Sequence, residues 1–145
     1  MEEWYAITDR CHERTFNLDD DLRSLSSDWE RELAALWRLE ADVNNGAYLQ
    51  FIWNWGHESY IYASQALKNI GATRMAEIID TCQALVDEHI QTKCYRQFDH
   101  LEDELPQAVN QRTLDLSYAF MDYPEDMAEL GLQCYRSFLE VPETK

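Results

Sequence analysis

The side chains with the most chemical potential in this sequence are carboxylates, which gather in three short segments. These segments fall within residues 19–30, 99–104 and 122–129. On a helix, carboxylates three or four residues apart stand about 5–6 Å apart at Cβ, and DNA carries one phosphate per 3.4 Å of axis on each strand. The segments therefore predict an anionic surface whose carboxylates substitute for phosphates. The predicted phosphate surrogates are Asp19, Asp20, Asp21, Asp28, Glu30, Asp99, Glu102, Asp103, Asp122, Glu125, Asp126 and Glu129.

Two simpler explanations of the acidic segments stay open. Charged runs are often solvated helix faces, and carboxylates near helix starts are favoured by the helix dipole. Adaptation to high salt is the other explanation, because the chain has three Lys against nine Arg. However, like charges at i, i+3 and i+4 destabilise a helix, which favours a function for the three segments taken together.

The remaining reactive side chains form no recognisable catalytic or metal-binding motif. None of the four histidines belongs to an HExxH or ExxH motif, and no two of the four cysteines form a CxxC pair. The sequence also lacks a Walker glycine loop, a calcium-binding loop and a G-x-S-x-G motif. We therefore expect no enzyme activity, no metal site and no cofactor.

The charge balance excludes several function classes. The chain has 145 residues, with 28 Asp and Glu against 12 Lys and Arg, which gives a formal net charge of −16. Direct binding to nucleic acid or to anionic membranes requires a surplus of basic residues, so the charge excludes both functions.

The hydrophobic content of 46% supports a packed core rather than disorder. The amino terminus lacks the features of a signal peptide, so we expect a cytoplasmic protein with reduced thiols.

Composition favours helices throughout. Gly and Pro total seven, and Leu and Ala total 29 against 11 for Val and Ile. We expect an all-α, bundle-like, single compact domain of six to eight helices over residues 1–145. Ser27 and Glu30 have capping-box spacing, and Thr73 is the expected cap of the clearest amphipathic helix. The first expected helix ends near residue 14. The expected helices that follow span about 28–43, 60–70, 73–90, 95–105, 107–121 and 124–139.

A family resemblance enters through a motif in the middle of the chain. The stretch from Glu32 to Gly46, followed by Gln50-Phe51, Asn54, Gly56, Leu67 and Ile70-Gly71-Ala72, resembles the bacterial DMP-type acidic DNA-mimic proteins over about residues 30–90. Ala47 stands where a second glycine is common, and Phe51 where tyrosine is common. The resemblance implies an all-α homodimer that acts as a decoy for double-stranded DNA. It would occupy a helix-turn-helix transcription factor and keep that factor from its operator.

Two alternatives remain from the residues themselves. We interpret the amides of Asn44, Asn45, Gln50 and Asn54 as structural, through turn formation, capping and buried hydrogen bonds. A polar ligand pocket walled by Trp53 and Trp55 is the other interpretation of the same segment. At the level of function, the alternative to DNA mimicry is an acidic adaptor that binds a non-DNA-binding partner through apolar surface.

Overall fold

The structure is a computed structural model that describes residues 2–17 and 21–139. It is 83% helical, and the described residues contain no strand, which confirms the all-α prediction. Short 3-10 helices connect the longer ones at η1 (Arg14–Asn17), η2 (Leu22–Ser24), η3 (Tyr95–Gln97) and η4 (Leu101–Glu104). The α-helices are α1 (Glu2–Glu13), α2 (Asp28–Gly46), α3 (Tyr48–Ile70), α4 (Thr73–His89), α5 (Gln107–Met121) and α6 (Met127–Leu139).

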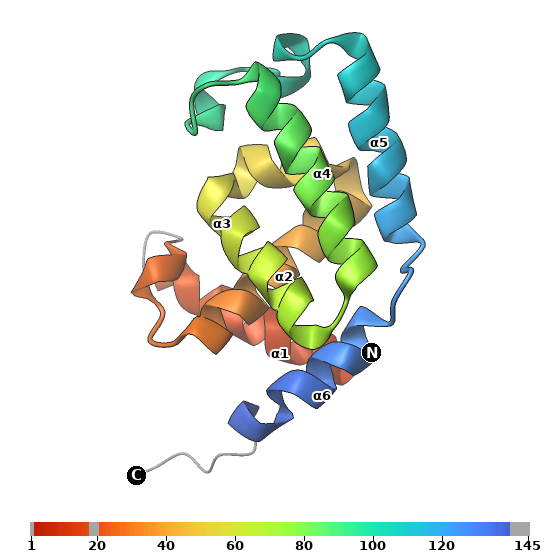
Figure 1. Cartoon of the computed structure of the whole chain (residues 1–145). Helices are drawn as coiled ribbons and strands as arrows, with labels where there is room; N and C mark the ends of the chain where they lie inside the picture. Colours follow the sequence, from red (N-terminus) through yellow and green to blue (C-terminus); the bar gives the residue numbers. More distant parts are fainter. Residues whose placement is uncertain (1, 18–20, 140–145) are drawn as a thin grey trace.

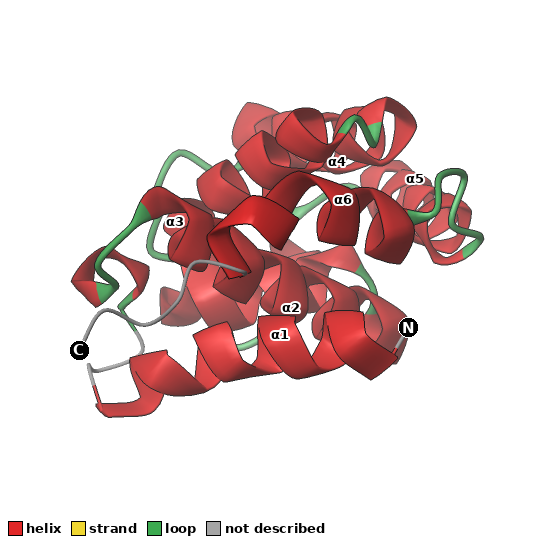
Figure 2. Cartoon of the chain, turned by 90° about the horizontal axis from the view of Figure 1, so that it is seen from below, coloured by secondary structure: helices red, strands yellow, loops and turns green. Residues whose placement is uncertain are grey.

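Helices α2 and α3 form the centre of the bundle. Helix α1 packs on α2, α4 packs on α3, and α5 lies beside α4 (Figure 1). Helix α6 returns across the lower end and contacts both α3 and α1, as the view from below also shows (Figure 2). Fully buried apolar side chains from four of these helices fill the space between them, among them Leu36, Phe51, Met75 and Phe120.

The turn between α2 and α3 explains a motif position. The predicted helix ends near residue 43, but α2 continues through Asn44, Asn45 and Gly46. The reversal falls on Ala47, whose φ of 77° and ψ of 177° lie in a region that is essentially restricted to glycine. Family members with glycine at this position would make the turn without strain.

Helix α3 begins at Tyr48, well before the helix predicted over about residues 60–70. Gly56 has a φ of 83° and kinks α3 between its first part, which contains Phe51, Trp53 and Trp55, and the predicted part. At the other end, Gly71 adopts the left-handed conformation, and the Ala72 amide donates to the Leu67 carbonyl at 2.8 Å. The predicted stop at Ile70-Gly71 is therefore confirmed.

Several predicted helix starts were wrong in detail. Ser27 is the N-cap of α2, but its hydroxyl donates a hydrogen bond to the Glu30 carboxylate instead of accepting one from a backbone amide. Thr73 is the first residue of α4 and does not cap it, because the N-cap position is Ala72. The 95–105 segment forms η3 and η4 rather than one helix, and α6 starts at Met127, after Pro124.

Candidate protein-interaction surface

The first acidic segment is largely neutralised by neighbouring arginines. Asp21 accepts from the backbone amide of Arg23 at 2.9 Å and pairs with its guanidinium at 3.0 Å. Asp28 is exposed and pairs with Arg31 at 2.7 Å. Asp19 and Asp20 lie outside the described residues. The described part of this segment therefore presents little unpaired negative charge.

Glu30 has an internal role. It is 5% exposed, and its carboxylate accepts from the hydroxyls of Ser26 at 2.5 Å and Ser27 at 2.9 Å. It also forms an ion pair with Arg14. Burial alone would raise its pKa, but these hydrogen bonds and the arginine outweigh burial and lower it. Glu30 thus remains charged while holding the start of α2 against η1, which follows α1.

The second acidic segment is exposed at the top of the molecule. Asp99, Glu102 and Asp103 all face solvent around η4. One oxygen of Glu102 lies 3.8 Å from Nδ1 of His100. Asp99 and Glu102 also border a cleft between η4, α3 and α5.

The third segment also contains carboxylates without a described ion-pair partner. Asp122, Asp126 and Glu129 are exposed, and none forms an ion pair within the described part of the chain. An oxygen of Asp126 accepts from the amide of Glu129 at 3.1 Å, which caps α6. Glu125 is different, because its two oxygens accept from the amides of Arg74 at 2.8 Å and Met75 at 2.9 Å. Glu125 therefore supplies the cap that α4 lacks from its own sequence.

Tertiary packing adds two carboxylates that the sequence analysis missed. The ring of Trp4 lies against Gly131 so closely that a Cβ there would overlap it. This contact brings the start of α1 to α6, where Tyr5 and Asp126 line a common hollow. The exposed Glu2 and Glu3 lie in the same first turn of α1 as Trp4, so we group them with the third segment. No local sequence pattern could have predicted this grouping. We call this set the corner surface: Glu2, Glu3, Asp122, Asp126 and Glu129.

A buried carboxylate holds the corner surface in place. Glu40 accepts from Nε1 of Trp4 at 2.9 Å and from the Tyr123 hydroxyl at 2.7 Å, so it joins α1, α2 and the α5–α6 connection. Burial raises the pKa of Glu40, although these hydrogen bonds partly oppose the rise.

The three segments lie at different edges of the fold. The stretch around η2 is at the lower left of Figure 1, η4 is at the top, and the α5–α6 connection is at the lower right. The fold therefore does not merge the predicted surrogates into one row.

The polar motif residues have mainly structural partners. Asp42 accepts from the side-chain amides of Gln50 and Asn54, each at 3.1 Å. The Asn44 amide donates to the Tyr123 hydroxyl at 3.1 Å. Asn45 is exposed. These bonds match the structural interpretation for Asn44, Gln50 and Asn54.

The two tryptophans proposed as pocket walls have different neighbours. Trp55 packs against the buried Arg38 guanidinium, 4.2 Å from the ring centre. Trp53 instead borders the cleft beside Asp99 and Glu102.

The four cysteines are free thiols, and two of them are buried. Among the described residues, no group of three His, Cys, Asp or Glu side chains is arranged to hold a metal ion. In the same residues, no helix is both long and apolar enough to cross a membrane.

The fold and surface define an acidic, all-helical protein. The sequence model of the DMP19-like protein family matches residues 23–137, so the chain belongs to that family. The match confirms the predicted resemblance and extends it from the central motif to α5 and α6. No curated protein and no solved structure matches the chain.

Proposed function

We propose that this protein is a DNA mimic that occupies a helix-turn-helix transcription factor and keeps it from DNA. The observation that carries the proposal is the corner surface, where Asp122, Asp126 and Glu129 are exposed without a described ion-pair partner. Membership in the DMP19-like family is compatible with this function. In the proposal, the corner carboxylates occupy the phosphate contacts of the basic face.

Electrostatics supports the corner surface over the first segment. A carboxylate paired with arginine, such as Asp28 with Arg31, would have to lose that partner before it contacted a basic protein. The corner carboxylates need no such exchange. In addition, the net charge of −16 would accelerate encounter with a basic face over distances near the Debye length. The exposed Asp99, Glu102 and Asp103 would add to this long-range attraction.

We extend the proposal to the properties that the resemblance implies. The protein acts as a cytoplasmic homodimer, without catalytic activity or cofactor. Because each chain carries −16, the dimer interface would be largely apolar. The exposed Ile61 and Tyr118 offer apolar surface that such an interface could use.

The test is displacement of DNA from purified helix-turn-helix repressors. Each repressor in a panel is bound to its labelled operator, and the folded protein is titrated in at about 50 mM salt. We expect the operator to be released from at least one repressor, with much weaker release at about 200 mM salt. Failure to release any operator at low salt would contradict the proposal. A complex that forms without releasing DNA, and that is insensitive to salt, would instead favour the acidic adaptor.

A further inference from the structure

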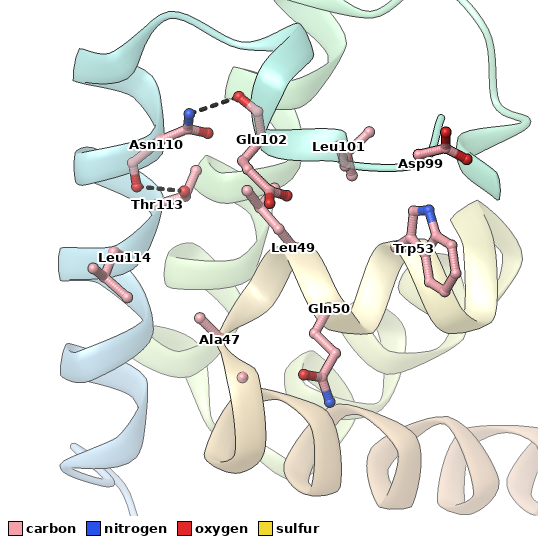
Figure 3. A pocket seen from close by; sticks show the side chains of 11 residues that line it. Ala47, Leu49, Gln50, Trp53, Asp99, Leu101, Glu102, Asn110, Thr113 and Leu114 are labelled. Carbon is pink, nitrogen blue, oxygen red and sulfur yellow. Dashed lines mark hydrogen bonds between the residues drawn. The ribbon is translucent and has the colours of Figure 1, made fainter. Parts of the chain in front are cut away.

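The cleft between η4, α3 and α5 is a second candidate site, away from the corner surface. It encloses about 420 Å³ and is open to solvent, which is within the range of small-molecule sites. Figure 3 shows that its walls come from the first turns of α3, from η4 and from the first half of α5. The α5–α6 connection, with Asp122 and Asp126, lies at the opposite end of α5 (Figure 1).

The polar groups open to this cleft are acceptors. The Glu102 carboxylate points into the space between α5 and α3 (Figure 3), and its side chain remains 56% exposed despite His100. Asp99 borders the same cleft next to Trp53. Among the described residues that line the cleft, none is Lys, Arg or His. The Glu102 carboxylate therefore faces the cleft without a lining cation, and Asp99 adds a second negative charge at its rim.

A third acceptor in the wall has no partner. The amide nitrogen of Asn110 donates to the Glu102 carbonyl at 2.7 Å. This bond fixes the side chain, yet its Oδ1 is buried and accepts no hydrogen bond within the described structure. Such an orphaned acceptor is unfavourable unless a donor reaches it. A donor on a ligand would remove this cost if the Asn110 side chain turned its Oδ1 toward the cleft.

The neighbouring polar side chains are already engaged. Nε1 of Trp53 donates to the Phe98 carbonyl at 2.8 Å, and the Thr113 hydroxyl donates to the Asn110 carbonyl at 2.9 Å. The Gln50 amide donates to Asp42. These bonds leave the cleft with few side-chain donors of its own.

The rest of the wall is apolar. Leu49, Leu101 and Leu114 line it together with the Trp53 ring. This surface fits a short hydrocarbon stem, whose burial contributes about 0.8 kcal/mol per methylene.

We propose that the cleft binds a small organic cation, a guanidinium or ammonium group carried on a short apolar stem. The cationic head pairs with Glu102 beside the Asn110 side chain, and Asp99 adds negative charge at the rim next to Trp53. The stem packs between the leucines and Trp53. The acidic field of the whole chain, with its net charge of −16, concentrates such cations at the cleft mouth.

The test compares n-butylguanidine with its neutral isostere n-butylurea on the full-length protein. Binding is measured by calorimetry and by NMR shifts of the Leu49, Leu101 and Leu114 methyl groups and the Asn110 side-chain amide. We expect saturable binding of n-butylguanidine, with the signals of these four residues shifting together. Binding of n-butylurea should be at least about tenfold weaker. Equal binding of the two compounds, or no saturable shift for n-butylguanidine, would overturn the proposal.

Two matched double variants separate the cleft from the general acidic field. Asp99→Asn with Glu102→Gln removes two charges that line the cleft. Asp103→Asn with Glu104→Gln removes two exposed charges from the same segment that do not line it. We expect the first pair to weaken n-butylguanidine binding by at least about tenfold and the second by less than about threefold. Equal losses in the two pairs would show that the cleft has no specific role. Both double variants should fold, because all four side chains are exposed. A native circular dichroism spectrum checks this.

Discussion

At the residue scale, burial decides which ionisable groups are held neutral. His12 is 2% exposed and its ring stacks on Trp37, with the centroids 3.9 Å apart. Its Nδ1 accepts from Nε of Arg38 at 3.2 Å. A protonated imidazole could not accept this bond and would stand beside the guanidinium. Burial and the Arg38 charge therefore lower the pKa of His12 to about 4.

This shift predicts a specific loss of stability in acid. The unfolded chain binds a proton at His12 below about pH 6.5, whereas the folded chain does so only near pH 4. The free energy of unfolding should therefore fall as the pH decreases from about 6.5 to about 4, by about 3 kcal/mol from this group. An NMR titration of the His12 ring measures the cause directly. A native His12 that titrates near pH 6.5 would contradict this explanation.

At the element scale, the helix ends depend on contacts from other parts of the chain. Helix α4 begins without a side-chain cap of its own, and Glu125 from the α5–α6 connection accepts two of its first amides. The turn before α3 depends on Ala47 in a conformation that suits glycine. Each feature predicts the effect of one substitution.

Replacing Glu125 with Ala should destabilise the start of α4. The change leaves the amides of Arg74 and Met75 without their acceptor and removes a negative charge from the helix amino terminus. We expect a loss of about 1–2 kcal/mol in the free energy of unfolding, measured by urea denaturation. Hydrogen exchange at these two amides should accelerate as well. The control is Glu129→Ala, which removes an exposed carboxylate that forms no hydrogen bond or ion pair with the described residues and should cost less than about 0.5 kcal/mol. Equal losses for the two variants would mean that Glu125 is no cap.

Replacing Ala47 with Gly should stabilise the protein. A non-glycine residue in this backbone region costs about 1–3 kcal/mol, and the extra entropy of glycine in the unfolded chain returns about 0.5–1 kcal/mol of that. We expect Tm to rise by a few degrees in a thermal melt. The control is Ala41→Gly within α2, which should lower Tm because glycine is a poor helix former. A lower Tm for Ala47→Gly would show that the turn does not strain alanine.

The same elements show how far the sequence could predict the structure. The end of α3 at Gly71 and the apolar face of α4 depend on residues only a few positions apart. The local sequence pattern was therefore sufficient to predict them. The cap from Glu125 and the contact of Trp4 with Gly131 join residues that are distant in sequence. Spacing along the chain carries no information about such pairs. For the same reason, the acidic segments were visible in the sequence, but their distribution over separate edges was not.

At the scale of the whole molecule, the excess of carboxylates is not uniformly available. Arginines pair with the described carboxylates of the first segment, and Glu30 and Glu125 hold helices together. The carboxylates of the corner surface, by contrast, form no ion pair with the described residues. DNA mimicry by this chain should therefore depend on where the charge lies and not only on its total.

The most direct test removes three corner charges and compares the result with the loss of three others. The corner variant carries Asp122→Asn, Asp126→Asn and Glu129→Gln, and Asn can still cap α6 at position 126. The control variant carries Glu13→Gln, Glu88→Gln and Asp115→Asn, which are also exposed. Both have the same net charge.

Both variants are titrated against a repressor that releases its labelled operator to the wild-type protein at about 50 mM salt. The DNA-mimic proposal predicts that the corner variant needs at least about tenfold more protein for half-release, and the control variant less than about threefold more. Equal potency of the two variants, when both are folded, would contradict the proposed role of the corner surface.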